Sequence, residues 1–182
     1  MTFHVRRALE LRKQFYGERH ELVAKDLYYS WVITPREPAE AAKVLAEAIN
    51  MMRETNLKNL NFPYMLSEYA NRLISADSAK VHEAYRQAIV PPTNEGNYQI
   101  AERYYKEALS VFREYYQEEN YAIVLYECAL AFAQIKQNKL AEFEEHYQIC
   151  QQSENKLKDE SSSEIIKKDL LEIEKVLAAA NR

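Results

Sequence analysis

The chain has 182 residues, a mass of 21.4 kDa and a formal net charge of −4. This length allows one domain with a sizeable hydrophobic core, and the small net charge gives no reason to expect binding to nucleic acid or to a membrane surface. Only two glycines occur, Gly17 and Gly96, so glycine-rich phosphate loops and dinucleotide-binding motifs are excluded.

Helices are expected along nearly the whole chain. Alanine, leucine, glutamate, lysine and glutamine are abundant, and all of them favour helix. We expect a break at Pro91 and Pro92, because tandem prolines cannot continue a helix. The helices expected before this break are residues 3–16, 20–34, 38–54, 62–75 and 78–90, and those expected after it are residues 97–117, 120–136 and 139–152.

A last helix is expected near the C-terminus. A polar linker begins at residue 153, and Ser161 followed by Glu164 has the spacing of a helix N-cap with a capping box. Ile166, Leu170, Ile173 and Leu177 then follow at intervals of 4, 3 and 4, which gives one apolar stripe. We expect this helix to cover the preceding hairpin, and a dimerising coil is the alternative.

Pairs of a small and an apolar residue recur along the chain. The pairs Ala8-Leu9, Ala48-Ile49 and Ala88-Ile89 are 40 residues apart, and Ala108-Leu109 and Gln148-Ile149 repeat the same interval. The phase shifts by 20 residues between the two sets. The pattern predicts a repeated helical hairpin in which one helix is missing near the proline break.

Two segments resemble the tetratricopeptide repeat family. Residues 94–109 resemble the second helix of such a repeat at Gly96, Tyr98, Ala101, Tyr105 and Ala108. Residues 7–24 are similar to the connector of the kinesin-light-chain subtype, except that Glu21 stands where that family has proline. The resemblance covers residues 3–152 and implies an all-α solenoid of about nine antiparallel helices. We therefore expect a repeat array over residues 1–152, with an irregular junction at 91–96, and a linker with a C-terminal capping helix over 153–182.

The resemblance also implies where a partner would bind. In tetratricopeptide arrays the first helix of each repeat lines a concave groove that holds a peptide. The matching positions here are Lys25, Tyr28, Tyr29, Tyr64, Ser67, Glu68, Asn71, Tyr126, Glu127 and Gln134. The paired asparagines of the kinesin-light-chain subtype and the lysine-asparagine clamp for a C-terminal carboxylate are absent, so the partner preferences of those proteins do not transfer.

The tyrosines of the groove have an alternative interpretation. Stacked helices also pack tyrosines between them, and we expect that role for Tyr69, Tyr85, Tyr98 and Tyr105. Both interpretations stay open for Tyr28, Tyr29 and Tyr126. The single tryptophan, Trp31, is either a core anchor or an exposed contact.

Residues that could carry catalysis or bind a metal are scattered. The four histidines, His4, His20, His82 and His146, fall in different expected helices or connectors and form no metal-binding motif. Cys128 and Cys150 lie in apolar stretches without metal-ligand spacing, so we expect buried, reduced thiols and a cytoplasmic location. We expect no catalytic residue, no metal and no cofactor.

These observations favour a protein-interaction adaptor that recognises a peptide segment of a protein partner, without nucleic acid or membrane contacts, as a monomer or as part of a larger assembly. The alternative is a regulatory sensor whose groove takes a small peptide or metabolite and whose array changes curvature. A third possibility is an enzyme with a site at the 91–96 junction, which would involve His82 or Glu95.

Overall fold

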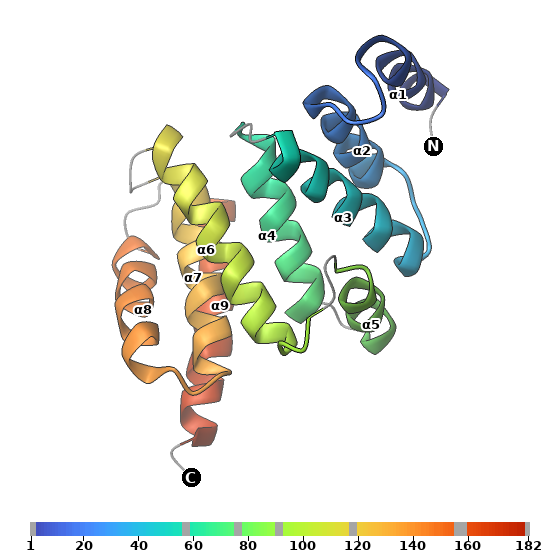
Figure 1. The fold of residues 1–182 in the computed structure, drawn as a ribbon. Coiled ribbons are helices and arrows are strands. Elements are labelled where there is room, and N and C mark those ends of the chain that lie inside the picture. Colours follow the sequence, from blue (N-terminus) through green and yellow to red (C-terminus); the bar gives the residue numbers. More distant parts are fainter. Residues whose placement is uncertain are drawn as a thin grey trace. The chain divides into compact units, whose positions relative to one another are not determined.

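The computed structural model describes residues 3–55, 59–74, 78–89, 93–116, 120–154 and 160–180. Within these residues the chain is helical and contains no strand, which confirms the expected all-α class (Figure 1). The helices are α1 (Phe3–Tyr16), α2 (Glu21–Ile33), α3 (Pro38–Thr55), α4 (Asn61–Ile74), α5 (Ala79–Gln87), α6 (Asn97–Tyr115), α7 (Tyr121–Ile135), α8 (Leu140–Glu154) and α9 (Glu160–Ala180). None of these described helices is long and apolar enough to cross a lipid bilayer.

The helices gather into two compact units. The N-terminal unit spans Met1–Glu95 and the C-terminal unit spans Gly96–Arg182. This division falls at the end of the 91–96 segment. Pro91 and Pro92, where we expected the break, lie outside the described residues.

The N-terminal unit is built around α3. This helix packs against α2, α4 and α5, while α1 packs against α2 and α4 packs against α5. One face of α3 is buried because apolar residues recur there at helical spacing. The buried residues of this face are Ala42, Leu45, Ala46, Ala48, Ile49, Met51 and Met52. Tyr69 of α4 and Tyr85 of α5 meet edge to face with 5.0 Å between ring centroids, and both are buried. The packing role expected for these two tyrosines is confirmed.

Two polar devices fix the ends of α2. At its start, the Nδ1 atom of His20 accepts a hydrogen bond of 3.2 Å from the backbone N–H of Leu22, so this histidine is the N-cap. At its end, the guanidinium of Arg36 donates to the Ser30 carbonyl at 2.6 Å and to the Ser30 hydroxyl at 2.9 Å. Arg36 also donates to the carbonyl of Thr34 at 3.2 Å. The Ser30 carbonyl also accepts a 3.1 Å hydrogen bond from the backbone N–H of Thr34, so the cation adds further donors at the negative end of the helix.

The C-terminal unit is built around α7. This helix packs against α6, α8 and α9, and α8 also packs against α9. Its sequence is apolar on nearly every side, with Glu127 as its one charged residue, and such a helix is expected to be buried all round. The apolar stripe of α9 lies on it: Ile166 and Leu170 join a cluster with Val124, and Ile173 joins a second cluster farther along.

The expected start of the last helix is wrong by a few residues. The helix α9 begins at Glu160, so Ser161 lies inside the helix and is not its N-cap. Several polar residues in succession offer start signals here, and sequence alone does not rank them.

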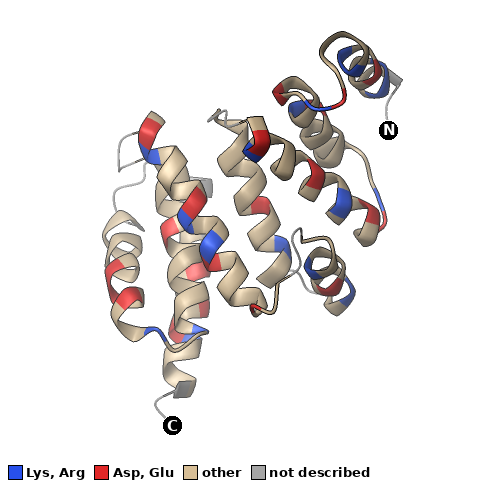
Figure 2. Cartoon of the chain, in the orientation of Figure 1, with Lys and Arg blue, Asp and Glu red and all other residues tan. Residues whose placement is uncertain are grey.

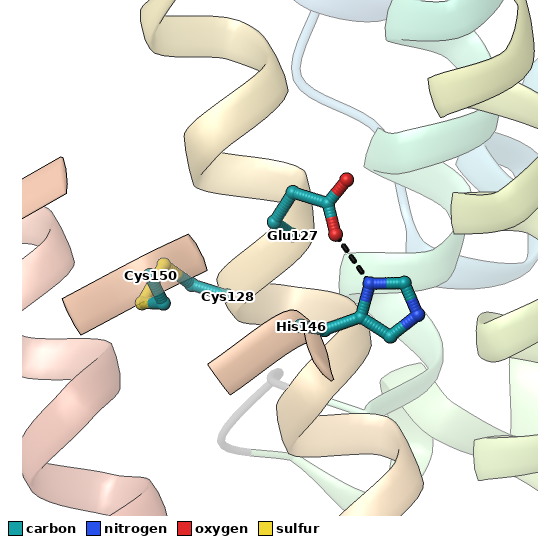
Figure 3. The surroundings of a disulfide bond; sticks show 4 residues. All are labelled: Glu127, Cys128, His146 and Cys150. Atoms are coloured by element: carbon teal, nitrogen blue, oxygen red, sulfur yellow. Dashed lines mark hydrogen bonds and ion pairs between the residues drawn. A yellow bond between two sulfur atoms is a disulfide. The ribbon is translucent and has the colours of Figure 1, made fainter. Parts of the chain in front are cut away.

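A disulfide joins Cys128 of α7 to Cys150 of α8 (Figure 3). The expectation of reduced thiols is therefore wrong. The two cysteines are 22 residues apart, and their Cα atoms lie 5.2 Å from each other. The position midway between them in the sequence is Lys139, which lies in the connector. In an antiparallel hairpin, two residues at equal distances from the connector lie side by side. This equal distance was the signal in the sequence that would have indicated the pair.

The connector between α7 and α8 turns through Asn138, which adopts a left-handed φ of 60°. The backbone N–H of Asn138 donates to the Ile135 carbonyl and that of Lys139 donates to the Gln134 carbonyl, both at 3.1 Å. This pair of hydrogen bonds is the Schellman helix ending, in which asparagine replaces the more common glycine. The sharp ending starts α8 directly after α7 and fixes the register of the hairpin.

Candidate functional site

A pocket of about 620 Å³ lies in the N-terminal unit, formed by α2, the connector to α3, the start of α3, α4 and α5. We call it the aromatic pocket. Its aromatic and charged lining residues are Tyr28, Trp31, Arg36, Glu68, Arg72 and Tyr85. Val32 and Ile33 of α2 also line it and are largely exposed, so the pocket has an apolar rim.

The aromatic wall of the pocket is held rigidly. The ring of Tyr28 lies nearly parallel to that of Trp31, with 6.1 Å between centroids and 10° between ring planes. The indole N–H of Trp31 donates a hydrogen bond of 2.9 Å to the hydroxyl of Tyr85. Because Tyr85 is buried and packed against Tyr69, this hydrogen bond fixes the orientation of the tryptophan.

The helix α4 contributes two opposite charges to the pocket. Glu68 and Arg72 are its only charged residues and lie one turn apart, and Figure 2 shows them as a red and a blue segment of this helix. The guanidinium of Arg72 lies over the ring of Trp31, 5.5 Å from its centroid, which is a cation–π contact. Glu68 is half-buried, and among the described residues its carboxylate has no hydrogen bond or ion pair.

Burial changes the protonation behaviour of this site. It raises the pKa of Glu68, and the nearby positive charge of Arg72, which lowers the pKa, does not offset that effect. Burial also raises the pKa of Tyr28 to about 12, with the charge of Glu68 as the next cause. Burial raises the pKa of Tyr85 as well, against the hydrogen bond from Trp31. Both tyrosine hydroxyls therefore stay protonated at neutral pH and can act as neutral hydrogen-bond donors.

The groove residues expected in α2 and α4 include two that line the aromatic pocket, Tyr28 and Glu68. Tyr29 is exposed, and the ammonium of Lys25 lies 5.6 Å from the centroid of the Tyr29 ring. The Tyr29 hydroxyl donates a 3.4 Å hydrogen bond to Asn61. These contacts place the expected residues of α2 beside the start of α4.

The other expected groove residues of α4 differ in exposure. Tyr64 and Asn71 are half-buried and do not line the pocket. Ser67 is fully buried, and its hydroxyl donates to the Pro63 carbonyl at 2.9 Å and to the Tyr64 carbonyl at 3.1 Å. Ser67 is therefore inaccessible to a partner.

The expected groove residues of α7 lie in the other unit and are buried. Tyr126 stacks on Phe112 with 5.3 Å between centroids, and Gln134 has no exposed surface. Glu127 is also fully buried; it accepts hydrogen bonds from Arg113 and His146, each at 2.5 Å, and Figure 3 shows the His146 ring turned toward it. These three side chains form no accessible surface, because α6, α8 and α9 surround the helix that carries them.

Sequence reasoning missed Arg72 as a site residue and assigned Tyr85 only to packing. The signal for Arg72 was its spacing of four residues after Glu68, which places both side chains on one face of a helix. The signal that marked Trp31 was its uniqueness in the chain. No pattern in the sequence indicated that α5 would bring Tyr85 within hydrogen-bond distance of it.

A second cluster of charges lies in the C-terminal unit around Glu102 of α6. Its carboxylate accepts hydrogen bonds from Lys106 at 2.7 Å and from Lys139 and Gln137 at 2.8 Å. Burial alone would raise the pKa of Glu102, but these hydrogen bonds outweigh it and lower the pKa to about 2. These donors come from α6 and from the connector before α8, so the cluster joins the two and has a structural role.

The ion cluster around Glu102 predicts acid sensitivity. The pKa of Glu102 is about 2 in the folded protein and 4.5 in the reference state, so its contribution to stability is complete above pH 4.5 and is lost as the pH falls toward 2. We expect the melting temperature of Glu102→Gln to fall less steeply over this range than that of the unaltered protein. Thermal unfolding followed by circular dichroism at several pH values measures this slope. Glu144→Gln, a change at an exposed position of α8, is the control and should keep the original slope.

The described ranges contain no group of three or more histidine, cysteine, aspartate or glutamate side chains that could hold a metal ion. Comparison with known proteins finds no family model that matches the chain and no curated protein that is similar to it. The function must therefore be inferred from the side chains themselves.

Proposed function

We propose that this chain is a non-catalytic interaction module of tetratricopeptide-like repeats that binds a peptide segment of a protein partner on the α2 and α4 surface of its N-terminal unit. The observation that carries the proposal is the aromatic pocket, with the parallel rings of Tyr28 and Trp31 held in place through Tyr85. Large, rigid aromatic side chains with hydroxyl groups suit recognition, because they bury much area and lose little conformational entropy.

The surroundings of the pocket support an extended ligand over a small one. Val32 and Ile33 at the rim of the pocket are 55% and 47% exposed, and Tyr29, which does not line the pocket, is 43% exposed, so apolar area continues beyond the pocket along α2. Exposed apolar area next to a concave site is typical of a surface that a partner covers. The proposed contact set is Lys25, Tyr28, Tyr29, Tyr64, Glu68 and Asn71 from the expected groove, together with Trp31 and Arg72.

The disulfide bears on the expected location of the protein in the cell. A cytoplasmic location was expected because the thiols were expected to be reduced. The disulfide between Cys128 and Cys150 removes that reason, since disulfides are rare in the cytosol and common in oxidising compartments.

A peptide selection tests the proposal. A random peptide library displayed on phage is selected on the full chain, and binding of the enriched peptides is measured by titration. Trp31 is the only tryptophan, so its fluorescence reports occupancy of the pocket directly. We expect enriched peptides to change this fluorescence and to bind the double variant Tyr28→Ser, Tyr29→Ser at least about tenfold more weakly, a loss of about 1.4 kcal/mol.

The control for this test is Tyr115→Ser, which replaces an exposed tyrosine of the C-terminal unit. This variant should bind as the unaltered chain does. Circular dichroism establishes that each variant is folded. Enriched peptides that bind the double variant with full affinity would show that the α2 surface is not the binding site.

A further inference from the structure

The aromatic pocket contains a half-buried carboxylate, that of Glu68, to which the described residues donate no hydrogen bond. It lies beside Tyr28 and has no ion pair among the described residues either. A carboxylate removed from water in this way needs a compensating positive charge or hydrogen-bond donors. The raised pKa of Glu68 agrees with this unmet requirement.

The positive charges already present in the pocket do not meet this requirement. The guanidinium of Arg36 is directed to the carbonyls at the end of α2 and to Glu40. Arg72 lies over the ring of Trp31, and its charge does not offset the burial of Glu68. Arg72 is exposed, so water and the tryptophan ring stabilise its charge. The carboxylate is therefore the group that a ligand can stabilise most.

The shape of the wall next to Glu68 favours a flat cation. Tyr28 and Trp31 form a nearly parallel pair, and a guanidinium already lies over Trp31. A second planar guanidinium can stack on an aromatic face and donate two hydrogen bonds to a carboxylate at the same time, whereas an ammonium is a compact point charge. Arginine therefore fits this wall better than lysine does.

On the basis of the proposed peptide-binding function, we propose that the partner peptide places an arginine side chain in the aromatic pocket, where its guanidinium pairs with Glu68 and stacks on the ring of Tyr28. Arginine would thus be the specificity-determining residue of the ligand. The neighbouring Val32 and Ile33 contact the peptide on either side of it.

Four capped pentapeptides with the same flanking glycines test this assignment. Their central residue is arginine, citrulline, lysine or norleucine; citrulline has the shape of arginine without its charge. Titrations with the full chain are followed by Trp31 fluorescence and by calorimetry. We expect the arginine peptide to bind about tenfold more tightly than the citrulline peptide, as one charged contact on an aromatic face allows. Lysine should rank between arginine and citrulline.

The variant Glu68→Gln separates the charge of the site from its shape. It should reduce the preference for arginine over citrulline to about twofold or less, because the aromatic faces remain and the carboxylate is gone. Glu83→Gln is the matched control: this exposed residue of α5 accepts a hydrogen bond from Gln87 of the same helix, and its replacement should keep the full preference.

The inference is overturned by any of three results: equal binding of the arginine and citrulline peptides, a preference that survives Glu68→Gln, or no binding of the arginine peptide at concentrations up to roughly 5 mM. The proposed function is tested separately by the phage selection. Selected peptides that depend on Tyr28 and Tyr29 but lack arginine would refute only the assignment of arginine. A selection that yields no pocket-dependent peptide would refute the proposed function.

Discussion

Replacing Glu127 with alanine is expected to destabilise the C-terminal unit by about 1–3 kcal/mol, which is the typical cost of leaving a buried hydrogen-bonding group unsatisfied. Glu127 has no exposed surface and accepts hydrogen bonds from Arg113 and His146. Its removal leaves the mostly buried His146 without this acceptor, whereas the side chain of Arg113 is 40% exposed and can turn to water. Urea denaturation of the full chain, followed by circular dichroism, measures this loss as a lower unfolding midpoint.

Two further variants identify the cause of that loss. Glu144→Ala removes an exposed glutamate of α8 and should change the unfolding free energy by less than about 0.5 kcal/mol. Glu127→Gln keeps the shape and part of the hydrogen bonding but removes the charge, so its effect should lie between the other two. A loss below about 1 kcal/mol for Glu127→Ala would show that the carboxylate adds little beyond its desolvation cost.

Reduction of the disulfide between Cys128 and Cys150 is expected to lower the unfolding free energy by about 3 kcal/mol, because it releases a closed loop from the unfolded chain. The loop closed by this bond has a sequence separation of 22 residues. Denaturation midpoints with and without a thiol reductant measure the effect on the same protein. The helices α7 and α8 should keep their packing when reduced, since their buried apolar contacts remain.

A variant with both cysteines changed to alanine is the control for the reductant. Its stability should match that of the reduced protein, apart from the small loss of buried volume, and should not respond to reductant. Titration of the purified, folded protein with a thiol reagent under denaturing conditions gives a direct check. Two reactive thiols, together with a midpoint that ignores reductant, would show that the bond does not form.

The helices were largely predictable because local patterns decide them. Amphipathic spacing and alanine-rich stretches gave helices whose ends lie within about three residues of those expected, and the stripe of Ile166, Leu170 and Ile173 packs against the preceding hairpin. The exact ends of the helices were harder to predict from the sequence. The hydrogen bonds of His20, Arg36 and Asn138 that fix these ends depend on where the adjoining segment lies.

The candidate site was predictable only in part. Tyr28 and Glu68 line the aromatic pocket, whereas Tyr126, Glu127 and Gln134 are buried. These three residues were predicted to face a groove because the resemblance to tetratricopeptide arrays implies that α7, as the first helix of its hairpin, has one side open to a partner. The composition of α7 indicated otherwise, because a helix with a single charged residue has no side suited to solvent. Tertiary packing decides how α2, α4 and α5 are positioned relative to one another. The hydrogen bond between Trp31 and Tyr85 depends on this positioning and could not be inferred from the sequence.

The central position of α7 has a consequence for how the sequence can vary. With α6, α8 and α9 packed around it, most positions of this helix are buried, and a larger or more polar residue there would have to move a neighbour. In a library that samples every substitution, these buried positions should therefore be the least tolerant of the C-terminal unit. The outward positions of α8 and α9, such as Glu144 and Leu171, should accept most replacements.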